Sequence, residues 1–104
     1  MKVMIREILR FLPGKMAEGT KLQEESLALT KKKIRHFPSV RKYAPWLGGG
    51  SSINTIIVDV EYKSLTQIEE FFEKTLADPE MMETNHKLEA ILESSKEELY
   101  IVMP

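Results

Sequence analysis

The chain has 104 residues, a net charge of −1 and no cysteine. This length suits a single domain over residues 1–104, and the missing cysteines exclude disulfides, thiolate catalysis and cysteine-ligated metal sites. No apolar run reaches the roughly 18 residues of a membrane-spanning helix. Charged side chains at Arg6, Glu7 and Arg10 interrupt any signal-peptide layout. We therefore expect a cytoplasmic protein without a membrane partner.

Charge is divided unevenly along the chain. Residues 1–52 carry 11 Lys and Arg against 4 Asp and Glu, whereas residues 53–104 carry 4 against 12. Such asymmetry is found in proteins with a nucleic-acid face. It equally suits two halves that attract each other within one fold or across a dimer.

The first half of the chain predicts a strand, a helix and an edge strand. Residues 3–11 are rich in β-forming types and short enough for a strand. From residue 15 to about residue 35 a less polar stripe recurs at helical spacing. Residues 40–46 predict a second strand, which Pro45 confines to an edge or a bulge. A flexible hairpin loop is expected at residues 48–52.

The second half predicts the clearest strand, two helices and a last strand. Residues 53–62 alternate between a wholly apolar face and a mixed face, so we expect both faces to be covered, the second incompletely. Ser64 to Gln67 is a capping box that opens a helix. Asp78-Pro79 opens another helix, expected to continue to about residue 95. The last strand is expected at residues 97–103.

Strand, helix, strand, strand, helix, strand is the order of a ferredoxin-like α+β fold. Its four-stranded antiparallel sheet has the first and third strands in the centre and helices on one face only. The other face would carry Met4, Ile8 and Ile57, which no element of the chain is left to cover. A second copy packed sheet to sheet supplies the cover, so we expect a homodimer through the sheet face.

Several short motifs are informative through their order and spacing. They are Ile5-Arg6-Glu7-Ile8, Pro13-Gly14-Lys15, residues 54–62, Ser64-Leu65 and Ala77-Asp78-Pro79-Glu80. Over nearly the whole chain they resemble NIPSNAP-type members of the dimeric α/β-barrel superfamily. The resemblance implies two ferredoxin-like protomers that form a barrel, with a cleft between each sheet and its helices. Antibiotic-biosynthesis monooxygenases, haem-degrading monooxygenases and muconolactone isomerases are relatives, so it also implies a site for a small organic molecule.

Charged residues on the two central strands are candidate ligand-binding groups. Arg6 alternates with apolar residues on the first strand, and Asp59 and Glu61 lie on the mixed face of the third. Because these strands are expected to be antiparallel neighbours, Arg6 falls beside Asp59 or Glu61. The charges form either a polar floor for an anionic or hydroxylated ligand, or a structural pair that fixes the register.

His86 is the candidate general base, since a neutral imidazole accepts a proton near pH 7, and Asp59 is its predicted catalytic companion. Haem-degrading relatives place an axial His in a similar segment. However, Leu76 stands where they carry Trp, and Arg6 and Glu7 stand where they carry Asn. We therefore expect no haem, no other cofactor and no metal. The alternative for His86 is a place on the helix surface.

Aromatic and basic residues of the first half offer two further interpretations. Tyr43 and Trp46 either line a ligand cleft or pack in the dimer interface. Residues 31–35 and 41–42 form a basic cluster of the kind that a nucleic acid requires. A helix C-terminus stabilises cations in any case, so we expect a solvated helix end rather than a nucleic-acid partner.

Two functions remain open. The first is binding or conversion of a small organic molecule, cofactor-independent and monooxygenase- or isomerase-like, in a cleft between sheet and helices whose polar groups include Arg6, Tyr43, Asp59 and His86. The second is a non-catalytic homodimeric interaction module with a filled barrel. A wet, concave pocket lined by Arg6, Asp59 and His86 would favour the first, whereas a filled barrel with His86 pointing to solvent would rule it out.

Overall fold

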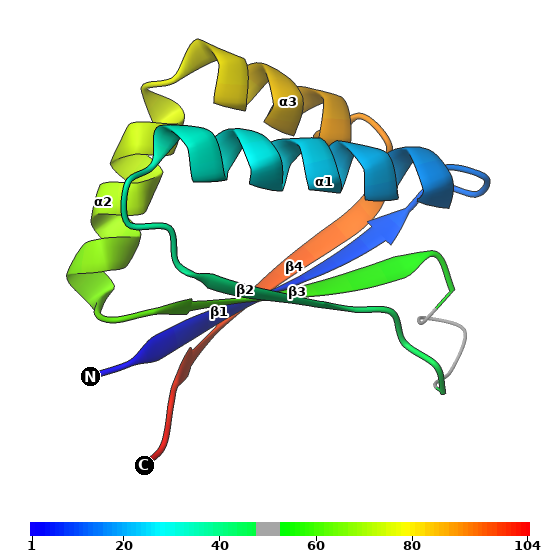
Figure 1. The fold of residues 1–104 in the computed structure, drawn as a ribbon. Helices are drawn as coiled ribbons and strands as arrows, with labels where there is room; N and C mark the ends of the chain where they lie inside the picture. The colour runs from blue at the N-terminus through cyan, green and yellow to red at the C-terminus, as the bar shows by residue number, and fades with distance from the viewer. Residues whose placement is uncertain (48–52) are drawn as a thin grey trace.

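The computed structural model describes residues 1–47 and 53–104, so the loop predicted at 48–52 lies outside the described residues. The elements follow the order β1 (Val3–Phe11), α1 (Met16–Lys33), β2 (Ser39–Tyr43), β3 (Thr55–Tyr62), α2 (Leu65–Leu76), α3 (Pro79–Glu89) and β4 (Leu92–Ile101). The four strands form one antiparallel sheet in the order β2-β3-β1-β4. All the helices lie on one side of this sheet (Figure 1). The predicted ferredoxin-like α+β fold is therefore confirmed, with β1 and β3 central.

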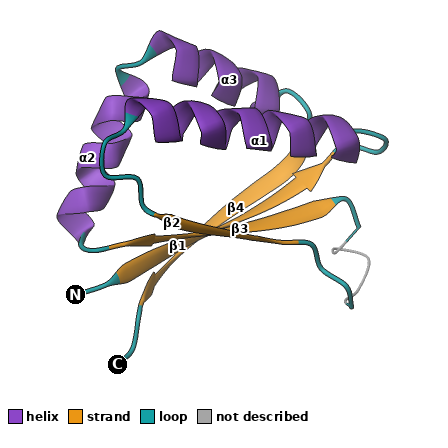
Figure 2. Cartoon of the chain, viewed as in Figure 1, coloured by secondary structure: helices purple, strands orange, loops and turns teal. Residues whose placement is uncertain are grey.

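The two faces of the sheet differ in their surroundings, as Figure 2 shows. On the side that the helices cover, here called the helix side, the strands contribute most of the hydrophobic core. This core consists of Val3, Leu9, Phe11, Ile56, Val58, Val60 and Tyr62 from the strands with Ile68 and Ile91. The opposite side, here called the open face, has no element of the described chain over it. Strand alternation therefore assigns odd positions of β1 and even positions of β3 to the core.

The end of the chain differs from the prediction. Helix α3 ends at Glu89 rather than near residue 95, and β4 begins at Leu92 rather than at residue 97. The segment 93–98 is almost entirely polar and shows little intrinsic β preference. It forms a strand because β1 offers it a free edge, with Leu92 opposite Phe11 and Lys96 opposite Ile8. Tertiary pairing overrides local propensity in this segment.

Both predicted caps of the second half are present. The backbone N–H of Gln67 donates to Ser64 Oγ at 3.2 Å, and the Gln67 side chain accepts from the backbone N–H of Lys63 at 2.6 Å. At the next helix, the backbone N–H of Met81 donates to Asp78 Oδ1 at 3.0 Å. These bonds satisfy donors that a helix start otherwise leaves free.

The uneven charge of the chain is partly used within the fold. Lys33, at the end of α1, has its Nζ 2.9 Å from Asp78 Oδ2 and 3.1 Å from Glu80 Oε2. Part of the predicted basic cluster thus bridges α1 to the start of α3 rather than facing solvent alone.

In the described part of the chain, no helix combines the length and the apolar character needed to span a membrane.

The Asp78 cap predicts acid-sensitive stability. Donation from the Met81 backbone, together with the Lys33 ammonium, lowers the pKa of Asp78. Because the folded pKa lies below the unfolded value of 3.8, Asp78 contributes stability above that pH, and the contribution is lost as the pH falls through the lowered pKa. Asp78→Asn keeps a capping oxygen but removes the charge. In thermal melts, its deficit against wild type should shrink below pH 3.8, and a deficit that stays constant contradicts this prediction.

Candidate functional site

Arg6 and Asp59 form the closest charge pair of the open face. They are register partners on β1 and β3. Arg6 Nε lies 2.8 Å from Asp59 Oδ1, and Arg6 Nη2 lies 3.0 Å from Oδ2, which is a bidentate pair. The hydrogen bond to Asp59 raises the pKa of Arg6. The guanidinium also lies 5.7 Å from the centroid of the Tyr100 ring. The predicted neighbourhood of Arg6 and Asp59 is confirmed, and both groups are occupied by each other.

The other predicted binding residues, Glu61, Tyr43 and Trp46, are not part of this charge pair. Glu61 pairs with Lys2 at 3.0 Å instead of with Arg6. Tyr43 lies opposite Ile57 at the end of β2 and is exposed. Trp46, beyond that strand, is 94 % exposed. The structure thus places Glu61 and Tyr43 on the open face and Trp46 beyond the end of β2.

His86 lies on α3 and is exposed. Because α3 covers the helix side, the sheet separates this helix from Arg6 and Asp59 (Figure 1). The pocket lined by Arg6, Asp59 and His86 that would favour the first function is therefore not formed among the described residues. The physical reason is the alternation of the strand, which turns Arg6 and Asp59 away from the helices. A catalytic role for His86 stays a prediction.

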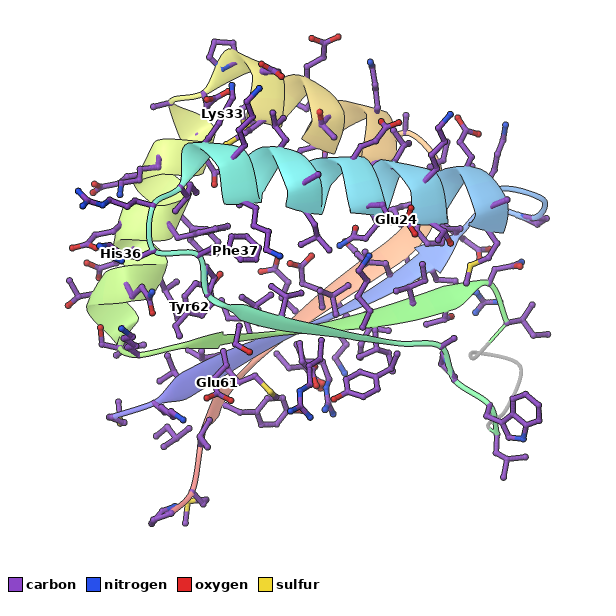
Figure 3. The ribbon with its side chains drawn as sticks, in the orientation of Figure 1. Glu24, Lys33, His36, Phe37, Glu61 and Tyr62 are labelled. Carbon is purple, nitrogen blue, oxygen red and sulfur yellow. The ribbon has the colours of Figure 1, made fainter. Side chains whose placement is uncertain are left out.

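A cavity of about 510 Å³ lies instead between the helix side of the sheet and the helices. Its size is within the range of small-molecule sites, and its walls are mostly apolar. The apolar lining includes Leu27 from α1, Phe71 and Phe72 from α2, and Met82 and Leu88 from α3. Figure 3 shows two further lining residues, Phe37 and Tyr62, between the helices and the sheet, with Glu61 on the other side.

Two carboxyl groups line this cavity from the sheet. Glu7 of β1 and Glu97 of β4 are register partners on the helix side. Neither side chain has a hydrogen bond or an ion pair with any described residue. Burial, and then the charge of Glu97, raises the pKa of Glu7. Burial and the charges of both glutamates raise the pKa of Tyr62, so its hydroxyl belongs to the same polar cluster.

Two amide side chains line the cavity from the helices. Gln23 of α1 is only 8 % exposed, and Asn85 of α3 is half-buried. Neither has a hydrogen-bond partner among residues 1–47 and 53–104. No side-chain nitrogen or oxygen of the described residues is both fully buried and without a partner, so the polar atoms of these amides are accessible from the cavity, where water or a ligand can bond to them. The cavity therefore combines apolar walls with polar groups that converge from both sides.

Glu7 was not predicted as a site residue, although the residue pattern of the strand at 3–11 points to it. In the strand at 3–11, the odd positions are Val3, Ile5, Glu7, Leu9 and Phe11. A single charged residue on an otherwise apolar strand face is unusual unless it is paired or functional. Arg6 was predicted as a site residue because acidic residues lie near it on the neighbouring strand. Glu7 has no oppositely charged partner in the described chain.

A smaller hollow of about 300 Å³ lies beside the start of α2 and includes His36, Lys63 and Lys74. Two backbone donors there, the N–H groups of Gln67 and Lys63, are already engaged in the capping box of Ser64 and Gln67. Among the described residues, no three His, Asp or Glu side chains are grouped as a metal site requires. The larger cavity is accordingly the candidate site. Its carboxyl pair can accept or deliver a proton in apolar surroundings.

Glu7→Gln should stabilise the protein at neutral pH. The folded pKa of Glu7 is raised above 4.5, so its contribution to stability is present below that pH and is lost as the pH rises through the folded pKa. Glutamine keeps the shape and removes the buried charge. We expect a gain on the order of 1 kcal/mol at pH 7, which raises the melting temperature by about 4 °C or more. The gain should vanish at pH 4.

Glu98→Gln is the matched control, because Glu98 is the next residue on β4 after Glu97 but faces the open face. The Tyr100 hydroxyl donates to Glu98 and lowers the pKa of its carboxyl. This variant should therefore show no gain at neutral pH. An equal gain in both variants would mean a general effect of net charge and would contradict the assignment to Glu7.

The comparisons with known proteins concern the fold. No family model matches the chain, and no curated protein matches its sequence. A solved NIPSNAP family protein from Agrobacterium tumefaciens superposes with a TM-score of 0.81 at 22 % identity, covering 99 % of this chain and 94 % of that one. An uncharacterised NIPSNAP domain protein from Burkholderia xenovorans gives 0.79 at 20 %, covering 99 % and 95 %.

SnoaB, a cofactor-independent oxygenase from Streptomyces nogalater, gives a TM-score of 0.74 at 14 % identity, covering 99 % of this chain and 94 % of its own. At these identities the likeness establishes the fold. The structural neighbours are thus NIPSNAP family proteins and an oxygenase with the same architecture, as the order of the sequence motifs predicted.

Proposed function

We propose that the protein binds a small, largely apolar organic molecule in the cavity between the helix side of the sheet and the helices. The cavity of about 510 Å³, with unpartnered polar groups on both sides, is the observation that carries this proposal. Conversion of the ligand would be cofactor-independent and monooxygenase- or isomerase-like, with Glu7 as the group that transfers a proton. The fold shared with a cofactor-independent oxygenase supports this reaction class.

We also propose a cytoplasmic location.

Filling the cavity tests the proposal. Leu27 lines it from α1, so Leu27→Trp adds bulk inside. Native mass spectrometry of freshly purified wild type should show a bound small molecule, and the variant should lose it. Leu12→Trp places the same bulk at an exposed residue of the β1–α1 connection and should retain the ligand. Retention of the same ligand in both variants would place it outside the cavity.

We further propose a homodimer formed through the open face. Several large apolar side chains are exposed at the two ends of this sheet. They are Tyr43, Trp46, Leu47 and Ile53 near the β2–β3 connection and Tyr100 and Met103 near the end of β4. The Arg6–Asp59 pair, already bidentate within one protomer, can be covered without leaving a charge unpaired. A copy of the chain offers the same surfaces in return.

Sedimentation at micromolar concentration checks the dimer. The expected mass is twice the 12.0 kDa of the chain. A compact monomer contradicts the proposed assembly. A dimer that never carries a ligand in the cavity would instead favour the alternative function, a non-catalytic homodimeric interaction module with a filled barrel.

A further inference from the structure

Most of the charged side chains that line the cavity are acidic. Glu7, Glu89 and Glu97 contribute carboxyl groups to its lining, and Lys96 is the basic residue among the described lining residues. Lys96 is not directed to those carboxyls, because its Nζ lies 3.3 Å from Glu98 Oε2, on the other side of the strand. Within the described chain, the carboxyl pair of Glu7 and Glu97 therefore has no counterion.

Like charges directly opposite each other in a sheet are unfavourable, and more so where burial weakens the screening by water. Glu7 and Glu97 are register partners of this kind, with Glu7 partly buried and Glu97 exposed, and burial raises the pKa of Glu7. A cation placed between the two carboxylates would remove the repulsion. The most favourable occupant of this polar end is thus a positively charged donor of hydrogen bonds.

An independent observation points to a ligand in the same cavity. Gln23 is more than nine-tenths buried, lines the cavity from α1, and has no hydrogen-bond partner in the described chain. Its amide oxygen is an acceptor, as the carboxylates are. The aromatic rings of Phe71 and Phe72 line the cavity from α2 and suit a flat apolar body.

We infer that the ligand is an apolar amine, with its ammonium group between Glu7 and Glu97 and its apolar body against the helices. The inference rests on the proposed function, because it names the class of molecule that the same cavity takes. It differs from the anionic or hydroxylated ligand expected at Arg6, since that arginine belongs to the open face and is occupied by Asp59. A carboxylate ligand at this pair would meet two carboxylates, while the lining cation Lys96 is paired with Glu98.

Three probes with one carbon skeleton test the inference: 2-(1-naphthyl)ethylamine, 1-naphthaleneethanol and 1-naphthaleneacetate. Calorimetric titration at pH 7 should give the amine an affinity at least about tenfold above the alcohol, as expected for a charge-assisted hydrogen bond. The acetate should bind most weakly. Equal affinity of amine and alcohol overturns the amine inference while leaving the cavity as a binding site. Binding of none of the three, with no ligand retained on purification, counts against the proposed function itself.

Two variants test whether the preference for the amine over the alcohol comes from the carboxyl pair of Glu7 and Glu97. Glu7→Gln should reduce the affinity for the amine about tenfold and change that for the alcohol little. Glu98→Gln removes an equal charge from the opposite face of β4 and should leave the preference for the amine intact. If both variants weaken amine binding equally, general electrostatic attraction explains it and the proposed contact with Glu7 is wrong.

Discussion

Val58→Asp should prevent the domain from folding. Val58 is 2 % exposed and lies in the centre of the core on the helix side of β3. The described structure places no cation there, so the new carboxylate would be buried without a partner. We expect a loss of at least about 4 kcal/mol, which is much of the roughly 5–15 kcal/mol that stabilises a domain. Circular dichroism at pH 7 should show loss of the cooperative thermal transition.

The same substitution one residue earlier is the matched control. Ile57 lies on the open face, with Ile8 and Tyr43 as its register partners. Ile57→Asp should keep the cooperative transition, because the carboxylate faces solvent in the protomer. It should nevertheless abolish the proposed homodimer in sedimentation experiments, since the charge would lie in the interface. Unfolding of both variants to the same extent would contradict the assignment of the two faces.

Gly19→Ala should destabilise the protein although alanine is the better helix former. Gly19 lies in α1 directly over the ring of Phe11, and a Cβ atom at this position would overlap that ring. Phe11 is 0 % exposed, so its ring has no free space to move into. Overpacking of this kind costs about 1–3 kcal/mol, against a gain of about 1 kcal/mol in helix propensity. Urea unfolding should give a lower midpoint than wild type.

Two further variants separate the contact from helix propensity. Ala28→Gly, at an exposed position of the same helix, should also destabilise, because propensity alone acts there. Shrinking the ring by Phe11→Leu should relieve Gly19→Ala, so the double variant is expected to be less destabilised than the sum of the two single variants. Strict additivity would show that the helix and the ring do not contact each other.

The fold was largely predictable because its pattern is strong. The strand at 3–11 matches β1, and the apolar alternation from Ile56 to Tyr62 identified the core face of β3. The caps at Ser64 and Asp78 marked the starts of two helices. These signals are local and have direct physical causes. The start of β4 was wrong, since the polar segment after Leu92 is a strand only through its pairing with β1.

The candidate site was less predictable, because it depends on which face of the sheet a residue occupies. Antiparallel pairing predicted Arg6 beside Asp59 or Glu61, and the pair that forms, with Asp59, lies on the opposite side of the sheet from the cavity. Glu7 is adjacent to Arg6 in sequence and opposite to it in direction. Gln23 falls on the less polar stripe of the predicted helix at 15–35, but the sequence alone could not show that its amide would have no partner in the described chain.

The central claim is that ligand binding belongs to the helix side of the sheet rather than to the charge pair of the open face. Nuclear magnetic resonance of isotope-labelled protein titrated with 1-naphthaleneethanol tests it most directly. We predict that the largest chemical-shift changes occur at cavity residues such as Gln23, Leu27 and Asn85. Saturable changes centred on Arg6 and Asp59, with the cavity residues unaffected, would contradict the account.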